Sequence, residues 1–100
     1  MEAVGLLEVY GCCAALAAAD AACKAANVRI EALDKNKPAN AEKLPVPLVM
    51  LVKIRGSVSD VEAALDAAQA VAESLTGVLC RYVIAAPEKD TGKMLKIRAM

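Results

Sequence analysis

The sequence contains the pattern strand, helix, strand twice, and this repetition constrains the fold more than any other feature. In the first half, residues 4–10 and 28–33 predict strands on either side of an alanine-rich helix at 12–26. In the second half, residues 48–54 and 78–85 predict strands around a helix that closes at Gly77. The order βαββαβ predicts an α+β, ferredoxin-like domain with a four-stranded antiparallel sheet and both helices on one face. A short polar C-terminal segment follows.

Local signals predict where the helices begin, end and bury their apolar sides. We expect the second helix to open with a capping box of Ser59 and Glu62. Its apolar side follows helical spacing through Val61, Leu65, Ala68, Ala72 and Leu75. The first helix is expected to end at Asn27, which tolerates the left-handed conformation common at helix ends.

The first helix is apolar on nearly every side, because Asp20 and Lys24 are its only charged residues. A helix of this kind must be shielded from water by other protein surfaces on almost every side. Hydrophobic residues make up 58% of the chain but aromatic residues only 2%, so its apolar side chains are mostly small and each buries little area. We therefore expect an obligate oligomer, in which copies of the chain cover one another.

Charge and hydropathy exclude several classes of function. The chain has 12 basic and 12 acidic residues and no basic stripe, which argues against binding to nucleic acid. No uninterrupted apolar run approaches the roughly 20 residues of a membrane-spanning helix. The opening Met1 and Glu2 lack the basic start of a signal peptide, so the sequence predicts a cytosolic protein.

Residues suited to catalysis or to metal binding are scarce. The chain has no histidine, and its serines have no partnered base. The D-T-G-K stretch at 90–93 lacks the first half of a phosphate-binding loop. The four cysteines, at positions 12, 13, 23 and 80, show no CxxC spacing, and we expect them to be reduced and packed as small apolar residues. The sequence therefore predicts no catalytic residue, no metal site, no cofactor and no enzymatic activity.

Four short motifs point to a known family. Residues 2–8 (E-A-V-G-L-L-E) resemble the opening strand of the bacterial microcompartment (BMC) shell domain, commonly E-A-x-G-x-x-E. Residues 19–28 are similar to the family's A-x-D-x-x-x-K-x-A-x-V helix exit, 54–58 (I-R-G-S-V) to V-R-G-D-V, and 83–87 (V-I-A-A-P) to V-I-P-R-P. These matches occur in the family's order across residues 2–87. The chain thus resembles the single-domain, hexamer-forming class of these shell proteins.

The resemblance implies a structural function. Members of the family form cyclic hexamers that tile edge to edge into the shell of a cytoplasmic organelle, the bacterial microcompartment, and pass metabolites through a pore on the six-fold axis. It implies one domain over residues 1–100, with a core at about 2–87 and a C-terminal tail at 88–100. The implied partners are five further copies in a homo-hexamer and other microcompartment shell proteins.

The resemblance also implies two sites. Lys24 matches the lysine at the hexamer edge. The hairpin between the second and third strands, at 35–47, corresponds to the pore, and its candidate pore residues are Lys35, Asn36, Lys37, Pro38, Ala39, Asn40, Ala41, Glu42 and Lys43. Three lysines against Glu42 would repeat around the axis as a positive ring, which favours anionic or neutral polar metabolites over cations.

The sequence departs from the family pattern at two places, and the properties of relatives at these places cannot be assigned to this chain. The hairpin is several residues longer than usual and contains no glycine, so the width of the pore is not inherited from relatives. Ala86 stands where many relatives have an edge arginine. The hairpin also contains no cysteine, so the iron–sulfur cluster of some tandem-domain relatives is not expected.

Other interpretations remain open from the sequence. An oligomeric βαββαβ domain that binds a regulatory small molecule would explain the fold and the missing catalytic groups, although not the four motifs. A scaffold unconnected with compartments is a third hypothesis. Taken alone, a lysine such as Lys24 is more commonly a solvated helix residue, here paired with Asp20, and the hairpin is also explained as a solvated connection.

Overall fold

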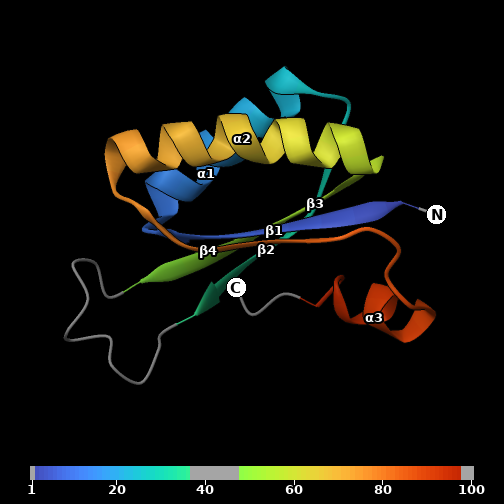
Figure 1. Ribbon diagram of the computed structural model, residues 1–100. Helices are drawn as coiled ribbons and strands as arrows, with labels where there is room; N and C mark the ends of the chain where they lie inside the picture. The colour runs from blue at the N-terminus through green and yellow to red at the C-terminus, as the bar shows by residue number, and fades with distance from the viewer. Residues whose placement is uncertain (1, 37–47, 98–100) are drawn as a thin grey trace.

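The computed structural model describes residues 2–36 and 48–97 (Figure 1). This part of the chain forms the following elements in order: β1 (Ala3–Tyr10), α1 (Cys12–Ala25), β2 (Arg29–Asn36), β3 (Val49–Gly56), α2 (Val58–Leu75), β4 (Val78–Ile84) and α3 (Lys89–Met94). The strand order in the sheet is β2-β3-β1-β4, and every neighbouring pair is antiparallel. The predicted βαββαβ order and α+β class are confirmed.

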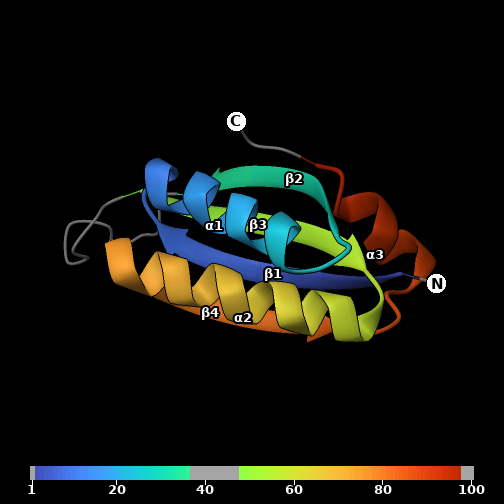
Figure 2. The same ribbon diagram turned by 90° about the horizontal axis from the view of Figure 1, so that it is seen from above.

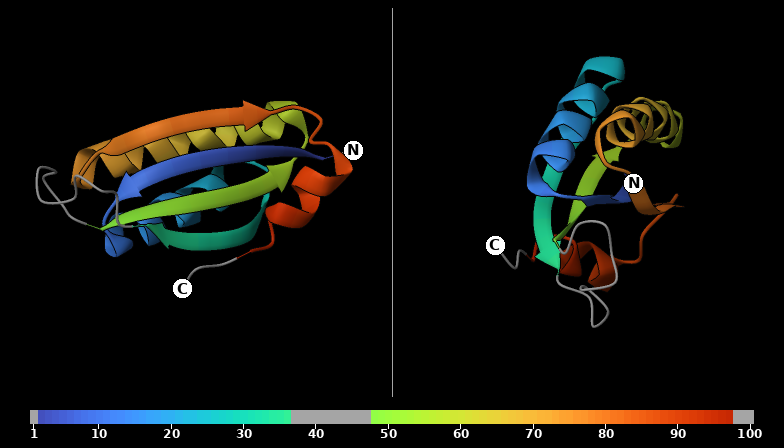
Figure 3. Two further views of the ribbon diagram at one scale, coloured as in Figure 1. Left: turned by 90° about the horizontal axis from the view of Figure 1, so that it is seen from below. Right: turned by 90° about the vertical axis from the view of Figure 1, so that its left-hand side faces the viewer.

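The molecule has a sheet with helices on both sides. Helices α1 and α2 lie side by side on one face, with α1 above β2 and β3 and α2 above β1 and β4 (Figure 2). This arrangement confirms the prediction for the two long helices. Helix α3 lies against the opposite face, close to the end of the sheet where β1 begins (Figures 1 and 3). The sequence predicted only a polar segment there.

The core lies between the two long helices and the sheet, and small residues let these layers approach closely. From α1 it contains only alanines, at positions 14, 15, 18, 19 and 22. Gly5 on β1 shows how close the approach is, because a Cβ added there would lie 2.7 Å from Cγ1 of Val61. A side chain at position 5 would therefore push α2 off the sheet.

Three predictions about the helix ends are wrong. The N-cap of α2 is Ser57, whose Oγ accepts a hydrogen bond of 3.1 Å from the Asp60 amide, so Ser59 lies inside the helix. Helix α1 ends in the extended residue Ala26, and no non-glycine residue in the described ranges has a positive φ, so Asn27 is not left-handed. Leu75 is 57% exposed, because the buried face of α2 ends at Ala72.

The cysteines do not pack in the core of the chain. All four are free thiols, as expected, but all four are exposed. Those on α1 are exposed because the alanine side of the helix faces the sheet and α2, while Cys12, Cys13 and Cys23 lie on other sides. The prediction of packed cysteines is wrong for the isolated chain.

Candidate functional site

The hairpin singled out from the sequence emerges where β2 ends and β3 begins. Asn36 pairs with Val49, and Lys35 pairs with Met50. Both candidate pore residues at the start of the hairpin are therefore strand residues, which corrects the expectation that the loop begins at Lys35. The Lys35 side chain is exposed.

The remaining candidates lie outside the described residues; these are Lys37, Pro38, Ala39, Asn40, Ala41, Glu42 and Lys43.

The end of the sheet that carries the hairpin is held by hydrogen bonds between three turns. The Gly11 amide donates to the Leu48 carbonyl at 2.8 Å, which ties the start of α1 to the residue before β3. The Tyr10 amide donates to the Gly77 carbonyl at 3.2 Å, and Thr76 Oγ1 donates to the Tyr10 carbonyl at 2.6 Å. The base of the hairpin is thus fixed to β1 and to the turn between α2 and β4.

Lys24 lies in the last turn of α1, and Cys12 begins that helix at the hairpin end of the sheet. Lys24 lies twelve positions further along the helix than Cys12, or about 18 Å along the axis. The Lys24 ammonium lies 2.7 Å from a carboxylate oxygen of Asp20, and its side chain is 76% exposed. The hydrogen bond that Lys24 donates to Asp20, together with the charge of that carboxylate, raises the pKa of Lys24 above its ordinary value. The ammonium is therefore charged at neutral pH and open to an external partner.

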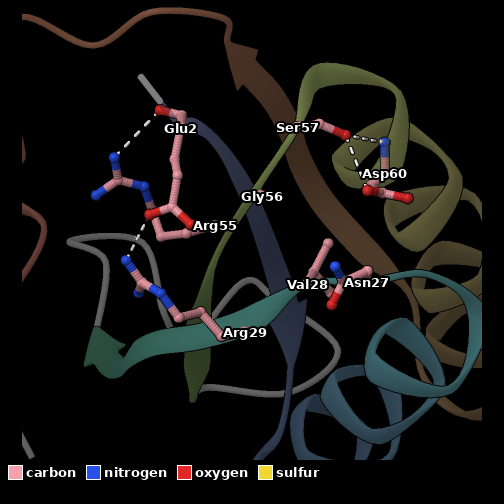
Figure 4. A pocket seen from close by; sticks show the side chains of 8 residues that line it. All are labelled: Glu2, Asn27, Val28, Arg29, Arg55, Gly56, Ser57 and Asp60. Carbon is pink, nitrogen blue, oxygen red and sulfur yellow. Dashed lines mark hydrogen bonds and ion pairs between the residues drawn. The ribbon is translucent and has the colours of Figure 1, made fainter.

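The motif Arg55-Gly56 at the end of β3 has a structural function in this chain. It lines a cavity of about 270 Å³, in which the Arg55 guanidinium donates to the Glu2 carbonyl at 3.1 Å (Figure 4). The same guanidinium donates to the Ala3 carbonyl at 3.2 Å. A Cβ added at Gly56 would lie 3.0 Å from the Asn27 carbonyl oxygen. Arg55 thus fixes the start of β1, and Gly56 lets the end of α1 cross closely over β3.

The two edge strands, β2 and β4, lie on opposite sides of the sheet (Figure 3). On the β4 side, Leu79 is 44% and Tyr82 63% exposed. On the β2 side, Ile30 is 42% exposed, and Leu16 on the neighbouring helix α1 is 53% exposed. Within residues 2–36 and 48–97 no further strand covers either edge. Two different apolar surfaces therefore remain open, and sequence reasoning had not located them.

The part of the chain that the structure describes has neither a cluster of metal-binding side chains nor a membrane-spanning helix. Residues 2–36 and 48–97 contain no group of three or more His, Cys, Asp or Glu side chains that could hold a metal ion. None of the helices in these ranges is both long enough and apolar enough to span a bilayer.

Comparison with known proteins assigns the family. The family model described as "BMC domain" matches residues 3–87. The microcompartment shell protein PduA of Citrobacter freundii is 38% identical over 94 residues, which cover 94% of this chain and 91% of that protein. The carboxysome shell protein CcmK3 of Halothece sp. is 35% identical over 97 residues, covering 95% and 86%.

A solved structure supports the same assignment. The microcompartment protein from Desulfitobacterium hafniense DCB superposes with a TM-score of 0.73 at 26% identity, over 96% of this chain and 47% of that one. The chain thus spans about half the length of that solved structure. With a family model across residues 3–87 and two shell proteins aligned over nearly their full lengths, the chain belongs to the BMC domain family and is a protein of the bacterial microcompartment shell.

Proposed function

We propose that the chain, as a single domain over residues 1–100, forms a cyclic homo-hexamer that tiles with other shell proteins into a layer with a central pore. The observation that carries this proposal is the pair of open edges on opposite sides of the sheet. A ring is built from heterologous contacts, in which one surface of each copy meets a different surface of the next. The exposed side chains near β4 and those near β2 and α1 supply two such surfaces.

The composition of α1 supports the same assembly. Cys12, Cys13 and Leu16 lie together at the start of α1 and are exposed in the single chain, although cysteine and leucine are among the residue types most often fully buried. Burial against a neighbouring copy removes this apolar surface from water and contributes about 25 cal/mol for each Å² buried. The neighbour in the ring therefore supplies the cover that the sequence predicted for this helix.

The hairpin and Lys24 are suited to opposite positions in a ring. We place the hairpin at the six-fold axis and Lys24 at the outer rim, because they lie at opposite ends of α1. With Lys35 exposed at the base of each hairpin, six copies would surround the axis with positive charge. Such a mouth favours anionic or neutral polar metabolites over cations.

We also infer that the protein catalyses no reaction. The chain has no histidine to transfer protons near neutral pH, and its relatives are named as shell proteins. The hydroxyl group of Ser57 caps α2 by accepting a hydrogen bond from the Asp60 amide.

Negative-stain microscopy of the purified chain, alone and mixed with a second shell protein, tests the proposal. Rings of six subunits and flat layers or tubes that incorporate both proteins are expected. Dimers or trimers whose melting temperature rises with one metabolite would support the regulatory domain instead. Rings that never incorporate the second protein would support a scaffold unconnected with compartments.

A further inference from the structure

A second cavity, of about 370 Å³, lies between α3 and the sheet, on the face that α1 and α2 leave uncovered. Its lining includes six charged side chains: Arg29, Glu31, Arg55, Lys89, Lys93 and Lys96. Arg29 pairs with Arg55 in the sheet, whereas Lys35 pairs with Met50 at the hairpin end. Lys35 lies six positions further along β2 than Arg29, or about 20 Å. The cavity is therefore distinct from the proposed pore.

The lining carries an excess of positive charge, with five cationic side chains against one carboxylate. Two more carboxylates approach from outside the lining, because Arg29 lies 2.6 Å from Glu2 and Lys93 lies 3.8 Å from Asp90. Five cations thus face three carboxylates in a chain whose net charge is zero. Lys89 and Lys96 form no ion pair with any part of the chain that the structure describes.

The floor of the cavity is fixed by internal contacts. Arg55 and Glu31 pair at 3.4 Å with side chains only 11% and 12% exposed, and Arg55 also donates to two carbonyl oxygens of the first strand. These groups cannot turn away without breaking several hydrogen bonds. Glu31 also lies 3.2 Å from Arg29, so the opposite charges of the floor largely offset one another, and the positive excess of the cavity comes mainly from its lysines.

The wall of the cavity is held in place by the residues that follow α3. Leu95 is only 6% exposed, and Lys53 donates a hydrogen bond of 2.9 Å to the Ile97 carbonyl. These contacts keep the lysines of α3 opposite the guanidinium groups of the sheet. Lys89 and Lys96 remain exposed and can move toward a bound molecule.

We propose that this cavity binds a small phosphate-bearing molecule. A phosphate carries close to two negative charges and accepts several charge-assisted hydrogen bonds. This matches the ammonium groups of Lys89 and Lys96, which form no ion pair within residues 2–36 and 48–97, above a floor that contains two guanidinium groups. A volume of about 370 Å³ lies within the range of small-ligand pockets. An uncharged molecule of the same size would leave these ammonium groups without a counter-charge.

Isothermal titration calorimetry of the assembled full-length protein with inorganic pyrophosphate tests the proposal. We expect one pyrophosphate per chain, with an affinity that falls as salt is added. The double variant Lys89→Gln/Lys96→Gln should bind about tenfold more weakly, because it loses two charge-assisted contacts. Both lysines are exposed and form no ion pair in the described chain, so the variant should keep the parent's circular dichroism spectrum.

Two control variants distinguish binding at this cavity from nonspecific electrostatic attraction to the protein. Lys89→Arg/Lys96→Arg keeps both charges and should bind within about threefold of the parent. Arg81→Gln removes a cation that pairs with Asp66 of α2, away from the cavity, and should leave the affinity unchanged. The proposal is overturned by absent binding at millimolar pyrophosphate or by an equal loss in Arg81→Gln. Equal binding of glycerol overturns it as well, and tighter binding of an acidic peptide would assign the surface to a protein partner instead.

Discussion

The ammonium group of Lys53 donates a hydrogen bond of 2.9 Å to the main-chain oxygen of Ile97, 44 residues further along the chain. Lys53 lies on β3 and is only 5% exposed, and its ammonium also pairs with the Asp34 carboxylate of β2. A buried lysine is stable only where its charge is paired and its donors are used. This residue therefore links the sheet to the segment after α3.

Replacing Lys53 with methionine should destabilise the fold and release α3. The change removes one partner of a buried ion pair, and we expect the free energy of unfolding to fall by about 2–4 kcal/mol at a fixed protomer concentration. Hydrogen exchange at the amides of α3 should become faster. Lys93→Met is the control, because that side chain is 71% exposed, and it should change stability by less than about 0.5 kcal/mol. Unchanged exchange in Lys53→Met would show that the hydrogen bond does not hold α3.

The two serines near the start of α2 should behave differently. Ser57→Ala removes the side chain that caps the helix and should lower the free energy of unfolding by about 1 kcal/mol. Ser59→Ala should cost less than about 0.5 kcal/mol, because Ser59 lies within the first turn. Urea denaturation of both variants measures the difference. The reverse order would place the cap at Ser59.

The two glycines at positions 5 and 92 provide a test of close packing. Gly5→Ala places a methyl group 2.7 Å from Val61 and should lower the free energy of unfolding by about 1–3 kcal/mol. Gly92→Ala makes the same chemical change in α3, where no atom of the described residues outside the helix's own backbone and the adjacent residues lies within 4 Å of the added Cβ. It should be neutral or stabilise by up to about 1 kcal/mol, since alanine favours helix. Equal effects in thermal melts would mean that α2 does not pack directly on β1.

The element order could be predicted from the sequence because hydrophobic periodicity records which face each segment buries. The start of α2 was predicted wrongly because two serines in this stretch, Ser57 and Ser59, each precede an acidic residue by three positions. The choice between the two serines as N-cap depends on where β3 ends. Gly56 packs closely against Asn27 and ends the strand there, so the helix begins directly after Ser57.

The cysteines and the surfaces of the chain were harder to predict. Periodicity shows that α1 needs cover, but it does not show whether the cover comes from the same chain. Leu16, Cys12 and Cys13 are therefore apolar and yet exposed. The buried position of Lys53 could not be predicted, because Lys53 is a single charged residue in an otherwise apolar strand. Its partners, Asp34 on β2 and Ile97 beyond α3, are distant in sequence. The candidate pore residues from Lys37 to Lys43 lie outside the described part of the chain, so their assignment stays a prediction.

Lys24→Ala should weaken the assembly of hexamers into layers and leave the hexamers intact. A lysine stem can lie along an apolar neighbour while its tip donates hydrogen bonds. Asp20→Asn is the matched control, because it breaks the pair within α1 and keeps the lysine. Size-exclusion chromatography should give the same ring size for both variants, while microscopy should show fewer layers for Lys24→Ala than for Asp20→Asn. Layers in Lys24→Ala at the parent's abundance would mean that Lys24 is an ordinary solvated residue.

An electron cryo-microscopy reconstruction of the assembled layer tests the central proposal most directly, because it locates both ends of α1 relative to the symmetry axis. The proposal predicts six copies around each axis, with Lys35 facing the axis and Lys24 at the contact between neighbouring rings. A ring of a different order, or one with Lys24 at the axis and Lys35 at the rim, would contradict it.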